Sequence, residues 1–182
     1  MNVKAVYIHI PKTGGTSFKK VFEPFINDHI VTEQSKIIKY QKNYYTNELS
    51  VINFEISNAL RNKEALGDEV WKNAFKFTLV RNPWDRVVSI FEHQINNCGH
   101  LFPQAGDCKV TNFRFFISLI KWLWEQDLLN YELDGHLRPQ TFYTHKNDNQ
   151  IIDFCGRYEN MSEDLKTLSK LAQFDLKNID IP

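Results

Sequence analysis

The sequence contains few cysteines, and those that it has follow no recognisable pattern. Three occur in 182 residues, namely Cys98, Cys108 and Cys155. An odd number of widely spaced cysteines does not predict a disulfide framework, and no set of Cys and His residues has the spacing of a zinc site. The cysteine content therefore argues against the small disulfide-rich and zinc-finger classes of protein.

The sequence also lacks an excess of one charge and a long apolar run. Its 22 basic and 22 acidic residues cancel, which argues against broad nucleic-acid binding but leaves room for a local basic pocket. The most apolar stretch, residues 113–124, is interrupted by Arg114 and Lys121, so no membrane-spanning helix is expected. No signal peptide precedes the first predicted strand. We therefore expect a cytoplasmic protein with no transmembrane segment and no nucleic-acid partner.

The sequence contains enough apolar residues to form a hydrophobic core. Hydrophobic residues make up 42% of the chain, which excludes disorder, and its length predicts one domain over residues 1–182. Runs of β-branched and aromatic residues predict strands at 3–8, 75–80 and 151–158. Apolar spacing predicts helices over 51–66, over 113–124 with Thr111 as the cap, and after Asn160, which forms a capping-box-like pair with Glu163.

A glycine-containing loop joins the first predicted strand to a helix. The helix is indicated by an apolar stripe at Phe18, Val21, Phe22 and Phe25. Two adjacent glycines allow the backbone to fold closely around a ligand, and the helix start offers unpaired N–H groups and a positive dipole end. We expect an anion-binding loop. Its members are Lys12, Thr13, Gly14, Gly15, Thr16 and Ser17.

The loop differs from a Walker A motif, because its lysine precedes the glycines. A simple turn between two elements is the alternative interpretation of this short segment.

A second candidate anion site follows the strand predicted at 75–80. Arg81 would stand at the carboxyl end of that strand, where ligands bind in open α/β sheets, and its planar fork suits a terminal phosphate; a structural ion pair is the alternative. Asn82 and Pro83 suit the cap and first position of a helix that contains Ser89. We expect its buried stripe to comprise Trp84, Val87, Val88 and Phe91.

Four segments of the chain resemble the carbohydrate sulfotransferase superfamily, particularly the branch of heparan sulfate 2-O-sulfotransferases and their bacterial relatives. They are HIPKTGGTS (9–17), FTLVRNPWDRVVS (77–89), HLRPQ (136–140) and DFCGRYEN (153–160). The resemblance implies an α/β, P-loop nucleotide-kinase-like three-layer fold with a short central parallel sheet. It also implies the donor 3′-phosphoadenosine 5′-phosphosulfate, no metal, and transfer of a sulfuryl group to a hydroxyl of a carbohydrate-type acceptor.

The resemblance also implies roles for individual residues. The loop from Lys12 to Ser17 would bind the 5′-phosphosulfate, and Arg81 and Ser89 would bind the 3′-phosphate. Lys12 would stabilise negative charge on the leaving phosphate. His136 and Arg138 are candidates for acceptor contacts, with an ordinary surface loop as the alternative.

The chain departs from that family in two ways. Many relatives carry a histidine base before the helix that precedes the second motif, whereas residues 51–56 contain none. Glu55 is the predicted substitute, with His29 and His93 as alternatives. The chain also stops at Pro182, short of the family's C-terminal segment. A non-catalytic relative that binds the same nucleotide remains an alternative, as does a small nucleotide-dependent kinase, against which the missing Walker spacing counts.

Overall fold

The computed structural model describes residues 3–15, 17–18, 50–54, 59–96, 110–126 and 135–172. The chain divides into two compact units, one formed by Met1–Val80 with Gln140–Pro182 and the other by Arg81–Pro139. In the described ranges, no helix combines the length and the apolar character needed to cross a membrane.

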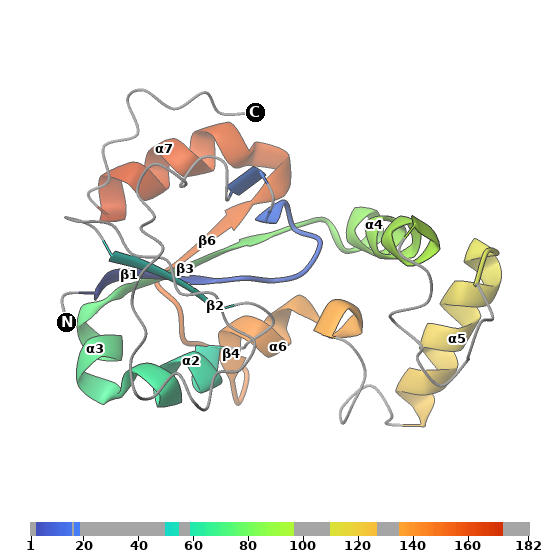
Figure 1. Cartoon of the computed structure of the whole chain (residues 1–182), viewed down its shortest axis with the longest axis horizontal. Coiled ribbons are helices and arrows are strands. Elements are labelled where there is room, and N and C mark those ends of the chain that lie inside the picture. The colour runs from blue at the N-terminus through green and yellow to red at the C-terminus, as the bar shows by residue number, and fades with distance from the viewer. Residues whose placement is uncertain are drawn as a thin grey trace. The chain divides into compact units, whose positions relative to one another are not determined.

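The first unit is built on a four-stranded parallel sheet (Figure 1). Its strand order is β2-β1-β3-β6, and every neighbouring pair is parallel. The carboxyl ends of all four strands therefore lie at one edge of the sheet. The strands are β1 (Val3–Ile8), β2 (Ser50–Phe54), β3 (Phe75–Val80) and β6 (Phe154–Arg157).

Helices cover both faces of this sheet. Figure 1 shows α7 on one face and α2, α3 and α6 on the other. The three layers and the short parallel sheet confirm the predicted fold class. The remaining elements of this unit are α2 (Ala59–Leu66), α3 (Asp68–Asn73), α6 (Gln140–Thr144), β4 (His145–Lys146), β5 (Asn149–Gln150), η6 (Tyr158–Asn160) and α7 (Met161–Ala172).

The alternation of side chains along β1 supplies two cores, one on each face of the sheet. Ala5 and Tyr7 belong to the cluster that includes Phe18, Phe77 and residues of α7. Val6 and Ile8 belong to the other cluster, which includes Trp71 and Tyr143. A strand that is buried on both faces is what a central strand of a parallel sheet requires.

The second unit contains α4 (Pro83–Asn96), α5 (Phe113–Glu125) and the short η5 (Gly135–Leu137). Among the residues that the structure describes, its buried cluster is smaller than either core of the first unit. The cluster consists of Ile90, Val110, Phe116, Leu123 and Leu137.

The helix expected over 51–66 is wrong in its first part. Residues Ser50–Phe54 form β2, which pairs with β1, and the helix begins at Ala59. Ile52 and Ala59, placed together by helical spacing, therefore belong to different elements. A buried parallel strand is a short apolar run, and periodicity alone does not separate it from helix.

The stripe expected on α4 is also wrong in part. Trp84 is 79% exposed and Val88 43%, whereas Arg86 and Ile90 are buried. The cap prediction is confirmed, because the Trp84 amide donates to Asn82 Oδ1 (2.9 Å).

Two predicted helix caps fall on neighbouring residues. Asn112, rather than Thr111, caps α5 by accepting from the Phe115 amide (3.1 Å). At α7 the carboxylate that accepts a hydrogen bond from Asn160 belongs to Asp164, rather than to Glu163.

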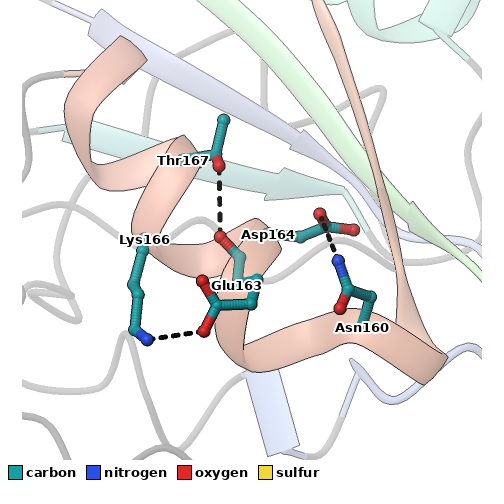
Figure 2. Close-up of polar contacts among 5 residues, drawn as sticks. All are labelled: Asn160, Glu163, Asp164, Lys166 and Thr167. Carbon is teal, nitrogen blue, oxygen red and sulfur yellow. Dashed lines mark hydrogen bonds and ion pairs between the residues drawn. The ribbon is translucent and has the colours of Figure 1, made fainter.

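Figure 2 shows that second arrangement. Asp164 Oδ1 accepts from Asn160 Nδ2 (3.2 Å), while Glu163 pairs with Lys166 (2.6 Å). The other carboxylate oxygen of Asp164 accepts from the Arg157 amide (2.6 Å), so Asp164 joins the first turn of α7 to β6. Its pairing with β6 depends on a tertiary contact that local capping rules do not include.

Candidate functional site

The loop after β1 turns sharply through two residues with positive φ angles. Lys12 adopts φ 65° and Gly14 adopts φ 92°. A lysine at positive φ is uncommon and carries a conformational cost. The chain then enters a helical turn, in which the Phe18 amide donates to the Gly14 carbonyl (2.9 Å). The predicted strand–turn–helix is therefore present, and the helical turn begins at the second glycine, Gly15.

Both glycines of the loop are required by close packing. A β-carbon at Gly14 would overlap the ring of Tyr158, and one at Gly15 would overlap the ring of His9. Tyr158 follows β6 and His9 follows β1, so aromatic side chains from two strand ends press against the turn. The glycines thus serve to admit these rings as well as to permit the backbone angles.

Thr13 points into the protein rather than out of the loop. The residue is fully buried, and its hydroxyl donates to the Ile10 carbonyl (2.8 Å). Its side chain therefore stabilises the turn from inside, and its hydroxyl is not exposed to a ligand.

Tyr7 lies beneath the loop in the core. Its ring stacks on Phe18, with 3.9 Å between the ring centroids, and lies 5.9 Å from the ring of His9. Burial raises the pKa of the Tyr7 hydroxyl well above its usual range, and the nearby Thr13 hydroxyl opposes that rise slightly. Tyr7 therefore stays neutral and acts as a packing residue.

A buried hydrogen bond fixes the end of β1 against β3. The Thr78 hydroxyl donates to the carbonyl of Ile8 (2.6 Å). Ile8 is the last residue of β1, immediately before the loop segment, so this bond sets the point from which the loop departs.

The second predicted anion site begins the second unit. Arg81 directly follows β3 and is half-buried, and Ser89 is half-buried on α4. Arg81 precedes the cap Asn82, so the strand end and helix start are separated by these two residues alone.

A third set of contacts involves the two predicted acceptor residues. The buried guanidinium of Arg86 donates from Nη2 to the His136 carbonyl (2.8 Å) and from Nη1 to the Arg138 carbonyl (3.0 Å). The ring of His136 stacks on that of His93, with centroids 5.3 Å apart. Sequence reasoning missed Arg86; a charged residue beside the predicted stripe of α4 was the available signal.

Several predicted residues lie outside the described residues. These are Thr16, Glu55 and His29. Of the three candidate bases, His93 alone is described, half-buried on α4. Within the described ranges, no group of three His, Cys, Asp or Glu side chains is placed to hold a metal ion.

The family of the chain follows from a comparison of sequences. The model of the sulfotransferase family matches residues 2–180, almost the whole chain. The chain belongs to the sulfotransferase family.

Two further proteins are similar to this chain. An uncharacterized protein of Archaeoglobus fulgidus is 30% identical over 112 residues, which cover 61% of this chain and 76% of that protein. The crystal structure of mouse sulfotransferase SULT7A1 complexed with PAP matches with a TM-score of 0.49 and 20% identity, over 100% of this chain. This chain spans 60% of the length of that mouse chain.

Proposed function

We propose that this protein transfers a sulfuryl group from 3′-phosphoadenosine 5′-phosphosulfate to a hydroxyl of a carbohydrate-type acceptor. The observation that carries the proposal is the loop after β1, where Lys12 and Gly14 hold positive φ angles directly before a helix start. Membership of the sulfotransferase family supports it.

The loop suits the 5′-phosphosulfate end of the donor. Backbone N–H groups from Thr13 to Ser17 would bind its non-bridging oxygens, together with the hydroxyls of Thr16 and Ser17 and the dipole of the following helix. Lys12 would meet the bridging oxygen, where negative charge develops as the phosphate leaves. Arg81 and Ser89 would bind the 3′-phosphate. The strands that precede the two predicted sites, β1 and β3, are adjacent and parallel, and Arg81 directly follows β3.

In the reaction, the acceptor oxygen forms a bond to sulfur while the bond from sulfur to the 5′-phosphate oxygen breaks. The hydroxyl proton passes to a base, which we assign to Glu55, with His93 as the alternative because it stacks on the proposed acceptor residue His136. His136 and Arg138 would contact the acceptor. Adenosine 3′,5′-bisphosphate is the other product.

The first test is binding of that bisphosphate. We expect it to raise the melting temperature of the protein, because a ligand that binds the native state stabilises it, and ATP with magnesium to have no such effect. The opposite pattern would favour a nucleotide-dependent kinase.

The second test is Lys12→Ala, assayed with the sulfated donor and a panel of unsulfated oligosaccharides. Loss of a preorganised donor to developing charge reduces kcat by about 10²–10³-fold. Lys12→Asn is the control for the backbone, since asparagine tolerates positive φ but supplies no ammonium. Full activity in either variant would contradict the role of Lys12.

Glu55→Gln tests the base separately. An inactive Glu55→Gln protein that still binds the bisphosphate would support the assignment. An unchanged kcat would leave His93 and His29 as the candidate bases.

A further inference from the structure

Arg86 is a buried arginine, and its guanidinium donates hydrogen bonds to backbone carbonyls. It is 6% exposed. Its two terminal nitrogens donate to the carbonyls of His136 and Arg138, at 2.8 and 3.0 Å. One planar group on α4 therefore holds two carbonyls of a single short segment, residues 136–138.

The chemistry of this contact favours arginine. A guanidinium presents several donors in a rigid plane, whereas a lysine ammonium is a point charge on a flexible stem. Carbonyls at the end of a short helical turn such as η5 lack partners within the turn. Buried polar groups are costly unless they are hydrogen-bonded, so Arg86 and these carbonyls satisfy one another.

Two more contacts tie the same segment to α4. The ring of His136 stacks on His93, with an interplanar angle of 19°. Leu137 is buried in the cluster that contains Ile90 of α4. All three residues 136–138 are thus held to α4. His136 is held by its carbonyl and its ring, Leu137 by its buried side chain, and Arg138 by its carbonyl.

We propose that Arg86 is a positioning residue, which sets the orientation of the acceptor-binding segment against α4. The inference rests on the proposed function, in which His136 and Arg138 contact the acceptor. Because α4 also carries Ser89, proposed to bind the donor, one helix orients both substrates. The placement of the acceptor for in-line transfer then depends on Arg86, although Arg86 touches neither the donor nor the acceptor.

The test that needs no substrate is amide hydrogen exchange over residues 135–138 in the full chain. We expect Arg86→Lys and Arg86→Gln to exchange at least about fivefold faster there, since the segment loses charge-assisted hydrogen bonds. Arg114→Gln is the matched control, because Arg114 is an exposed arginine of α5 in the same unit. Should Arg86→Gln fail to fold, Arg86→Lys, which keeps the charge, carries the test. Unchanged exchange in the folded Arg86 variants would overturn the proposal.

The kinetic test uses the sulfated donor with the best acceptor of the oligosaccharide panel. Arg86→Lys should raise the KM for the acceptor about tenfold and change the KM for the donor less than twofold. An equal rise in both KM values would identify a merely structural role and overturn the proposal. Failure of the wild-type protein to bind the bisphosphate would instead remove the proposed function, and the exchange result would still decide whether Arg86 orders the segment.

Discussion

The two units of the molecule differ in how far their described aromatic side chains are exposed. In the first unit, Tyr7, Phe18 and Phe77 are buried and pack ring against ring, with centroids 3.9–5.6 Å apart. The second unit leaves several large aromatics exposed, namely Trp84, Phe115, Trp122 and Trp124.

The difference matters for the proposed site because the loop after β1 stands on the dense core. Tyr7 and Phe18 flank the loop in the chain, and Thr78 fixes the end of β1. A turn with two positive φ angles persists only where its surroundings hold it. The dense core of the first unit is such a surrounding, so we expect the loop after β1 to be held rigidly.

The largest expected effect compares one fully buried phenylalanine from each unit. Phe77→Ala should lower the free energy of unfolding by about 3–5 kcal/mol, because it removes a ring from the dense core. Phe116→Ala should cost less, since the described cluster around it is smaller and we expect it to relax more readily into the vacated space. Chemical denaturation followed by circular dichroism measures both, with the slope checked for two-state behaviour. Equal losses would break the comparison.

The next effect separates two glycines that share a backbone conformation. Gly14→Ala should cost at least about 2 kcal/mol and weaken bisphosphate binding, because positive-φ strain and overlap with Tyr158 act together. Gly67 has φ 81° but open space around it, so Gly67→Ala should cost only the strain, about 1–2 kcal/mol.

Calorimetric titration with the bisphosphate completes that experiment. A double variant with Tyr158→Ala should recover part of the stability that Gly14→Ala loses. If Gly14→Ala bound the bisphosphate normally, the tight turn would not be the donor site.

The sequence predicted most of what surrounds the loop. The strands at 3–8 and 75–80 and the cap at Asn82 are confirmed, because each is set by local pattern. The close contact of Gly14 with Tyr158 could not be predicted from local pattern, because the two residues are distant in the chain.

Arg86 shows the same limit in the second unit. Its burial results from carbonyls about fifty residues away, and no local rule places a charged residue inside. Helical spacing alone predicted that Trp84 is buried on that face. A helix that packs against a small core can leave such a side chain exposed instead. Hydrophobic periodicity thus failed for Trp84 and Val88 on α4, where the buried positions are those of Arg86 and Ile90.

The smallest expected effect tests that last point with a pair of tryptophans. Trp84→Ala should change the free energy of unfolding by less than about 0.5 kcal/mol, because the side chain is 79% exposed. Trp71 is the buried counterpart in the first unit, and Trp71→Ala should cost about 3–5 kcal/mol. Chemical denaturation followed by circular dichroism compares them directly. A loss of more than 2 kcal/mol on Trp84→Ala would mean that the indole is covered in solution, and the contrast between the two units would then be much weaker.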